Sequence, residues 1–431
     1  MGAPEWECRN GWFLLPIGNI LDRPNDGSES FEPPGDTMPE AVIVSTARSP
    51  IGRASKGSLV DLRPDDLAAT IVNAALEKVP ALDRNLVEDL IMGSGQPGGE
   101  AGYNLGRMVA ILADMPDVPG VTVNRYCSSS LQTIRMAAHA IKAGEGDIFI
   151  AAGVETVSRY MNGAADTGPH NIKFGPAEAR TAERTAGGQP SWTQPTGLPD
   201  AYIAMGQTAE NVGEFENVSR EEMDEFAAQS QQRATAALER GFFDREITPV
   251  TTPDGTVVSK DDGIRPGTTV EGLSGLKPVF RPDGKITAGN ACPLNDGAAA
   301  VIVMSDTRAA ELGLKPLARI VASGVTGLNP EIMGMGPVEA CRQALARAGM
   351  TIDDVDLVEI NEAFAAQVIP SYQDLGVPLD KLNVNGGAIA VGHPFGLSGA
   401  RITGTLINGL RSTDGTLGWS APSGTRSPPS N

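Results

Sequence analysis

Cysteine and histidine are scarce in this sequence. The 431 residues contain four cysteines and three histidines. Cys8, Cys127, Cys292 and Cys341 are far apart and form no Cys-x-x-Cys pair, which excludes zinc ribbons and disulfide frameworks. Three histidines are too few for a histidine-rich metal site. We therefore expect no metal ion, and a protein of a reducing, cytoplasmic compartment.

Basic side chains and long apolar runs are scarce as well. There are 34 Lys and Arg against 53 Asp and Glu, a net charge of −19. Nucleic acids and anionic membrane surfaces are bound by clustered Lys and Arg, so neither is expected as a partner. No apolar run approaches the roughly 20 residues that span a bilayer. A few local cations would still suffice to hold an anionic small molecule.

The sequence does contain 51 glycines and a regular alternation of strand-like and helix-like segments. The runs Ala41–Val44, Asp89–Met92 and Asp147–Ala152 are typical of buried strands. Segments 104–113 and 128–142 between them are typical of helices. This alternation predicts an α/β fold with helices on the faces of a buried sheet.

The alternation divides the chain into five segments. We predict a disordered or mis-annotated extension (1–37), a first α/β half (38–157, completed by 292–315), an inserted loop domain (158–291), a second α/β half (316–411) and an atypical tail (412–431). The inserted domain contains a capping box, Ser219 with Glu222, that predicts a long helix to about Arg240. In the second half, Ala318–Val325 and Asp356–Ile360 are expected strands.

The two halves resemble each other weakly. Met92 precedes Cys127 by 35 residues, and Glu359 precedes His393 by 34. In each half a strand leads toward a turn of small residues and then a helix. This similarity is consistent with a duplicated fold that brings two equivalent turns together, and equally with coincidence.

Cys127 lies in Asn-Arg-Tyr-Cys-Ser-Ser-Ser, where a strand gives way to a helix. The partial positive charge of a helix N-terminus favours a thiolate, and its free N–H groups can hold an oxyanion. The local residue pattern fits a nucleophile and a buried small hydrophobe equally well.

His393 and Asn361 are the candidate partners of Cys127. His393 projects from a glycine-rich turn, Val-Gly-His-Pro-Phe-Gly, where a neutral imidazole can accept a thiol proton; the alternative is an exposed histidine in a structural turn. Asn361, in Asn-Glu-Ala-Phe, can position a water or polarise a carbonyl, and by itself is better explained as a helix cap.

Together these segments resemble the thiolases, the acetyl-CoA acyltransferases, from Met38 to about Leu410. The resemblance also includes Gly153–Thr156, Met205–Asn211, Thr287–Asn290 and Asn295–Ala300. It implies a thiolase-like fold of two similar βαβαβ-type halves with an inserted loop domain. The motifs are most similar to those of the degradative bacterial 3-ketoacyl-CoA thiolases. The resemblance implies a homodimer or homotetramer.

The resemblance implies a ping-pong acyl transfer in fatty-acid β-oxidation. Cys127 would attack a 3-ketoacyl-CoA with His393 as its base, and a water held by Asn361 would complete an oxyanion hole. Coenzyme A then takes the acyl group as a substrate, and no permanently bound cofactor is expected. The matching positions for substrate binding are Met205, Arg265, Phe280, Ala288, Cys292, Ala363 and Phe364.

The sequence departs from the thiolase pattern in three places. Ser130 replaces a glycine common among relatives and is expected to crowd the turn. Cys292 replaces a serine that contacts the pantetheine arm. Thiolases also carry a second catalytic cysteine in a final strand, whereas no cysteine follows Cys341 here. We expect the match to stop near Leu410 to Leu417, with an unpaired sheet edge and reduced turnover.

Three functions therefore stay open. The first is a thiolase, with activity reduced if the second cysteine is required. The second is a catalytically impaired acyl-CoA-binding or scaffold protein. The third, a ketoacyl synthase, is disfavoured because those enzymes generally pair their cysteine with a second histidine or with an asparagine in another context.

Overall fold

The computed structural model describes residues 38–160, 165 and 167–421, so the predictions for 1–37 and for 422–431 fall outside it. The strands are β1 (Ala41–Arg48), β2 (Gly52–Arg53), β3 (Asp89–Gly93), β4 (Gly120–Val123), β5 (Ile148–Thr156), β6 (Val250–Thr251), β7 (Val257–Val258), β8 (Asn295–Ser305), β9 (Ala318–Arg319), β10 (Leu357–Ile360) and β11 (Gly418–Ala421). The helices are α1 (Pro64–Glu77), α2 (Leu105–Leu112), α3 (Ser129–Ala143), α4 (Gly175–Thr185), α5 (Met205–Phe215), α6 (Arg220–Glu239), α7 (Val270–Ser274), α8 (Asp306–Glu311), α9 (Gly336–Ala348), α10 (Ala365–Leu375), α11 (Ala388–Val391) and α12 (Ser398–Thr413).

The main sheet has the strand order β4-β3-β5-β8-β1-β9, with β2 attached to β8. Strands β3, β4 and β5 are parallel, whereas β8 is antiparallel to both β5 and β1. All residues of β5 and β8 are buried, as expected for central strands covered on both faces. The predicted strands at 41–44, 89–92 and 147–152 are confirmed.

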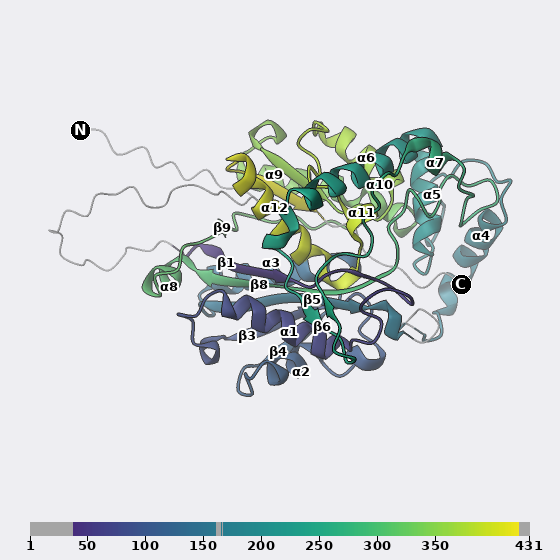
Figure 1. Cartoon of the computed structure of the whole chain (residues 1–431). Helices are drawn as coiled ribbons and strands as arrows, with labels where there is room; N and C mark the ends of the chain where they lie inside the picture. Colours follow the sequence, from purple (N-terminus) through teal and green to yellow (C-terminus); the bar gives the residue numbers. More distant parts are fainter. Residues whose placement is uncertain (1–37, 161–164, 166, 422–431) are drawn as a thin grey trace.

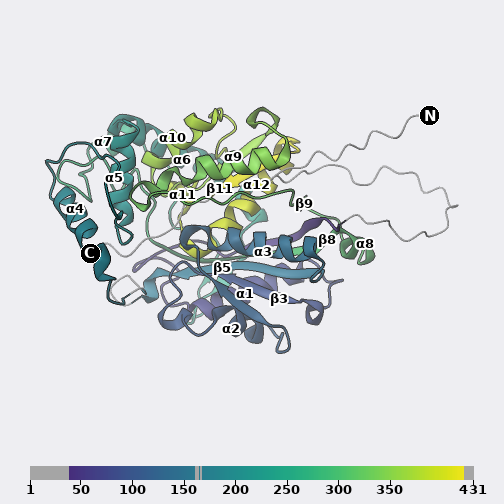
Figure 2. The same ribbon diagram turned by 180° about the vertical axis from the view of Figure 1, so that it is seen from behind.

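Helices cover both faces of this sheet. α1 and α2 lie on one face, and α3 and α12 lie on the other (Figures 1 and 2). α12 also contacts β10 and β11, so α3 and α12 form a layer between the main sheet and the second sheet. Their apolar side chains share one core with those of β1, β5 and β8. This middle layer is where the two halves of the chain meet.

The second sheet differs from the sequence prediction in two ways. Among the described residues, the expected strand Ala318–Val325 is reduced to β9, whose Ala318 and Arg319 pair with β1 of the main sheet. No strand was expected in the segment after Leu417, but β11 forms there and pairs in parallel with β10; the predicted open sheet edge stays a prediction. The tail 412–431 is therefore partly regular.

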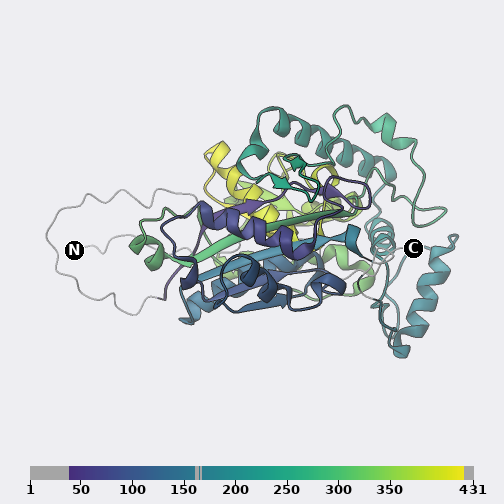
Figure 3. The ribbon, with the colours of Figure 1, turned by 60° about the horizontal axis from the view of Figure 1, so that its bottom comes forward.

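The loop domain lies beyond one end of the strands and contains α4, α5 and α7 (Figures 1 and 3). The long helix α6 begins with the predicted capping box: the Ser219 side chain accepts from Glu222 N–H, and the Glu222 side chain accepts from Ser219 N–H. Residues 250–258 form the small β6–β7 hairpin.

Candidate active site

Cys127 lies in a tight turn, the 3-10 segment Tyr126–Ser128, directly before α3. Two side chains hold this turn. Asn124 accepts from the Tyr126 N–H at 2.8 Å, and the Ser129 hydroxyl accepts from the Arg125 N–H at 2.9 Å. Tyr126 has φ +44°, a left-handed conformation that a tyrosine adopts only when its surroundings impose it. The cysteine is thereby fixed at the entrance of the helix.

The predicted preference of Cys127 for the thiolate is wrong for the resting protein. Burial, with a smaller contribution from the Glu155 carboxylate, raises the pKa of the Cys127 thiol to about 12. Only 4% of the residue is exposed, so the thiolate would lose more hydration than the helix N-terminus returns. A base must therefore remove the thiol proton during the reaction.

The turns that carry Cys127 and His393 are brought together by close backbone packing. A Cβ on Gly153 would lie 2.1 Å from the Gly396 carbonyl oxygen and 2.6 Å from the Ser130 Cβ, so β5 admits only glycine there. Ser130, which was expected to crowd the turn, is buried, and its hydroxyl accepts from the Ala400 N–H at 2.9 Å. Ser130 thus ties α3 to α12.

His393 is buried and held at three points. Its N–H donates to the Asn295 side chain at 2.8 Å, Nδ1 lies 2.5 Å from the Ser398 hydroxyl, and Nε2 lies 3.3 Å from Asn361 Nδ2. The Ser398 hydroxyl donates to the Pro394 carbonyl, so it accepts from Nδ1–H. This network assigns the proton to Nδ1 and leaves Nε2 as the basic nitrogen.

His393 is neutral in the resting protein. Burial, helped by the guanidinium of Arg401, lowers the pKa of the imidazole to about 3. The ring is therefore neutral at physiological pH and able to accept a proton at Nε2. The Asn361 amide at this nitrogen follows β10, and its N–H donates to the Ala421 carbonyl at 2.8 Å. β11 thus helps to position Asn361.

Glu155 and Ser398 are structural parts of the site that sequence reasoning missed. The buried Glu155 carboxylate accepts from the N–H groups of Gly95 (2.6 Å), Gln96 (3.1 Å) and Gly396 (2.7 Å). It therefore joins the end of β5 to the turn after β3 and to the turn after His393. Glu155 belongs to a motif noted in the sequence, but its role as an acceptor of backbone N–H groups depends on three distant segments.

Most predicted substrate-binding residues lie along one apolar wall. The Cys292 N–H donates to the Ala363 carbonyl at 2.9 Å, and the rings of Phe280 and Phe364 pack edge to face at 6.2 Å. Met205 belongs to the same apolar cluster. Cys292 is also close enough to Cys127 for their charges to interact: burial raises the pKa of Cys292, and Cys127 raises it further.

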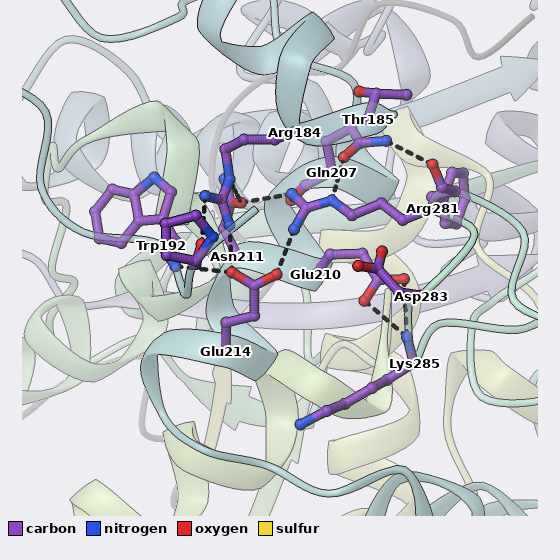
Figure 4. Close-up of polar contacts among 12 residues, drawn as sticks. Arg184, Thr185, Trp192, Gln207, Glu210, Asn211, Glu214, Arg281, Asp283 and Lys285 are labelled. Carbon is purple, nitrogen blue, oxygen red and sulfur yellow. Dashed lines mark hydrogen bonds and ion pairs between the residues drawn. The ribbon is translucent and has the colours of Figure 1, made fainter. Parts of the chain in front are cut away.

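A buried network in the loop domain fixes this wall (Figure 4). Arg281 donates to Gln207 at 2.7 Å and to Asn211 at 2.6 Å, and it pairs with Glu214 at 2.5 Å. Gln207 in turn donates to the carbonyl of Phe280 at 2.8 Å. Phe280 is thus held in place by the hydrogen bond from Gln207 to its carbonyl and by the next residue, Arg281, which donates to Gln207.

Arg265 and Ala288 lie apart from that wall, and both are exposed. The Arg265 N–H donates to the Gln231 side chain, whose amide donates to the carbonyl of Ile389, just before His393. Burial, followed by repulsion from Arg53, lowers the pKa of Arg265. Two cations therefore face the same region, and Arg53 was not predicted from the sequence. Ala288 has an exposed side chain in the turn from Thr287 to Asn290.

The described part of the chain contains neither a metal-binding cluster nor a helix that could span a membrane. Residues 38–160, 165 and 167–421 contain no group of three or more His, Cys, Asp or Glu side chains arranged to hold a metal ion. No helix in those ranges is long and apolar enough to cross a membrane. The three cysteines in these ranges are free thiols.

Comparison with known proteins gives the class. Family models of the thiolase N-terminal and C-terminal domains match residues 41–307 and 314–425. A crystal structure of a Bacillus anthracis acetyl-CoA acetyltransferase has the same fold, with a TM-score of 0.79 and 37% identity over 90% of this chain and 96% of that one. The chain therefore belongs to the thiolase family and is an acyltransferase.

The names of two relatives are more specific than the family name. A 3-ketoacyl-CoA thiolase of Cronobacter sakazakii is 44% identical over 88% of this chain and 95% of its own length. A beta-ketoadipyl-CoA thiolase of Acinetobacter baylyi is 44% identical over 88% of this chain and 94% of its own length. The C-terminal family match reaches residue 425, so the predicted end of the resemblance near Leu410 to Leu417 is wrong.

Proposed function

We propose that this protein cleaves 3-ketoacyl-CoA with coenzyme A, giving acetyl-CoA and a shortened acyl-CoA, through a covalent intermediate on Cys127. The observation that carries the proposal is the close packing of the turn of the buried Cys127 against the turn after His393, whose imidazole is neutral and oriented. A thiol of raised pKa needs such a base. The names of the relatives supply the substrate class.

In the first half-reaction, Nε2 of His393 takes the thiol proton while Cys127 Sγ attacks the keto carbonyl. Backbone N–H groups at the start of α3 and the Asn361 amide are the candidate donors to the developing oxyanion. Collapse breaks the bond between the carbonyl carbon and the neighbouring α-carbon, and acetyl-CoA leaves as its enolate. In the second, after His393 has passed its proton to the enolate, the thiol of coenzyme A gives its own proton to His393 and takes the acyl group from Cys127, and the Cys127 thiolate that leaves regains that proton.

The enolate must gain one proton before acetyl-CoA is complete. The family resemblance gives that task to a second cysteine, and no cysteine follows Cys341 in the 431 residues. Loss of an acid/base group slows a reaction by roughly 10²–10⁴-fold. We therefore propose that this chain forms the acyl-enzyme and turns over slowly.

Coenzyme A is proposed to bind with its phosphates at Arg265 and Arg53 and with its pantetheine arm along Met205, Phe280, Cys292 and Phe364. The mutual repulsion of the two arginines supports this, because an anion between them would relieve it. Gln231 connects the Arg265 backbone to the segment before His393. Ala288 and Ala363 are proposed as smaller contacts.

We propose that the protein forms a homo-oligomer through the surface that α2 and the edge strand β4 form on the main sheet. β4 is its edge strand, and the neighbouring α2 exposes Met108 (40%), Ile111 (46%) and Leu112 (44%). Contiguous apolar side chains beside an unpaired edge are typical of subunit interfaces. Sedimentation of Met108→Glu beside the unmodified protein tests this, with dissociation expected. The free thiols support the proposed cytoplasmic location, and β-oxidation is the proposed role.

Thiolysis of acetoacetyl-CoA and of a longer 3-ketoacyl-CoA, with free coenzyme A, tests the function. Cys127→Ala is compared with Cys341→Ala, which removes a buried cysteine of α9 outside the site. Release of acetyl-CoA by the unmodified protein and by Cys341→Ala, lost in Cys127→Ala, supports the proposal. No release and no acyl adduct on Cys127 would reject it in favour of an acyl-CoA-binding protein.

A further inference from the structure

Arg401 is a buried cation on α12 that takes no part in the proposed steps of acyl transfer. The residue is 3% exposed. Its Nη1 lies 3.8 Å from the carboxylate of Glu359 on β10, a long ion pair. Within residues 38–160, 165 and 167–421, its Nε and Nη2 have no hydrogen-bond partner. A guanidinium that is removed from water and so weakly paired costs stability, which points to a role beyond packing.

The Arg401–Glu359 pair lies directly behind His393. Arg401 follows Ser398 by three residues on α12, so the two side chains share one face of the helix, and the Ser398 hydroxyl lies 2.5 Å from Nδ1 of His393. Glu359 precedes Asn361 by two residues in extended chain, so these side chains point the same way, and Asn361 Nδ2 lies 3.3 Å from Nε2. α12 packs on β10. The pair is therefore a second link between α12 and β10, about one helical turn from the imidazole.

The positive charge of Arg401 is only partly offset by its neighbours. The charged groups that act on it are Glu359, Glu362, Glu246 and Arg48. Glu246 already pairs with Arg48 at 3.0 Å, and Glu362 accepts hydrogen bonds from three other groups. Burial raises the pKa of Glu359 to about 8, so most of this carboxyl is protonated at neutral pH. Arg401 therefore keeps an electrostatic effect on what lies beside it.

His393 is the group on which this charge bears in the proposed reaction. Burial lowers the pKa of His393, and Arg401 lowers it further. When Nε2 has taken the thiol proton, the ring is an imidazolium, and a neighbouring guanidinium makes it a stronger acid. The enolate needs that proton, and no second cysteine follows Cys341 to supply one. A cation behind the ring therefore favours the step that the missing cysteine leaves slow.

We infer that Arg401 is a positioning residue for the proposed acyl transfer: with Glu359 it holds α12 against β10 behind His393, and its charge drives the proton from the imidazolium to the enolate. In that step the Nε2–H bond breaks and the electron pair of the enolate forms a C–H bond at the α-carbon. Acetyl-CoA is then complete and the ring is neutral again. The inference rests on the proposed function, because the proton is the one taken from Cys127.

Exchange of the imidazole C2 hydrogen for deuterium tests the charge effect without acyl transfer. The exchange proceeds through the imidazolium, so near neutral pH its rate rises with the pKa of the ring. Mass spectrometry of digests resolves His139, His170 and His393, which are far apart in the sequence. In Arg401→Met the rate at His393 should rise about two-fold or more. The rates at the other two histidines should not change.

Matched variants separate charge from structure. Arg401→Lys keeps the charge and should preserve the exchange rate of His393, whereas Arg401→Gln should raise it as Arg401→Met does, so one neutral variant suffices if the other does not fold. Arg233→Met removes an α6 cation that acts on Glu359 and Glu362 and should leave the rate unchanged. Equal rates in Arg401→Lys and Arg401→Gln, or the same rise in Arg233→Met, overturn the inference.

Amide exchange of α12 in the same digests shows whether the helix has loosened. The inference predicts faster C2 exchange at His393 with the amides of α12 still protected. A rise at His393 that occurs only together with faster amide exchange assigns Arg401 a purely structural role and contradicts the inference.

Steady-state thiolysis tests the role in turnover. Arg401→Gln should lower kcat roughly 3- to 10-fold with KM for coenzyme A unchanged, and Arg401→Lys should restore most of kcat. The same kcat in both variants is evidence against the proposed charge effect. Failure of the unmodified protein to acylate Cys127 would reject the proposed function instead, and the C2 exchange rates of His393 would still report on Arg401. The two failures are thus distinguishable.

Discussion

Replacing Glu155 by glutamine tests how the site is held together. The Glu155 carboxylate is 1% exposed, and its two oxygens accept from three backbone N–H groups and from the hydroxyls of Ser94 and Tyr160. A glutamine has one acceptor oxygen in place of two. Its amide nitrogen must then face at least one N–H that it cannot satisfy.

The expected loss of stability in Glu155→Gln follows from these hydrogen bonds. One buried N–H without an acceptor costs about 1–3 kcal/mol, and the remaining bonds lose their charge assistance, about 1 kcal/mol more. We therefore expect Glu155→Gln to lower the free energy of unfolding by about 2–4 kcal/mol. The same change removes the negative charge beside Cys127, one of the causes that raise the thiol pKa. The pKa of Cys127 should therefore fall.

Two assays measure these changes in stability and in thiol pKa. Urea unfolding gives the stability, and the pH dependence of iodoacetamide alkylation at Cys127 gives the thiol pKa. Glu100→Gln is the control, because Glu100 pairs with Arg63 and Arg159 at the surface, where an ion pair contributes about 0–1 kcal/mol. Equal stability in the two variants, or an alkylation profile unchanged by Glu155→Gln, would refute the reasoning.

Three further changes have defined outcomes. Ser398→Ala should lower kcat/KM roughly 2- to 10-fold, the equivalent of one hydrogen bond to Nδ1, and Ser398→Thr should restore it. The folded pKa of His393, about 3, lies below its unfolded value of about 6.5, so the unfolded state binds a proton first on acidification. Stability should therefore fall by about 2 kcal/mol between pH 6.5 and pH 5, and His393→Asn should flatten that part of a urea-unfolding series. Arg281→Met removes the hydrogen bonds to Gln207 and Asn211 and one of the two arginines that pair with Glu214, and should cost about 1–3 kcal/mol, with a higher KM for coenzyme A because Phe280 shifts.

Much of the fold could be predicted from local sequence pattern. The buried strands of the main sheet and the capping box of α6 depend on neighbouring residues, and both were located correctly. The helix α9 ends at Gly349, which has the left-handed conformation that terminates helices. Strand β9 was overpredicted because an apolar run becomes a strand only where another edge accepts its hydrogen bonds.

The candidate site was less accessible to sequence reasoning. Residue types pointed to Cys127 and His393, but the raised thiol pKa comes from burial, which a sequence pattern does not quantify. Ser398 lies five residues beyond His393 and gave no signal of its own. Its relevance depends on a tight turn that returns its hydroxyl to Nδ1. Likewise, Arg53 and Arg265 are far apart in the sequence, and only the folded chain brings them near each other.

The central claim is that Cys127 carries the acyl group and His393 activates it. The most direct measurement is mass spectrometry of the tryptic peptide Tyr126–Arg135 after incubation with acetoacetyl-CoA. We predict one acyl group on Cys127 in the unmodified protein and none in His393→Ala. Acylation of Cys292 in place of Cys127, or acylation of Cys127 that persists without His393, would contradict the account.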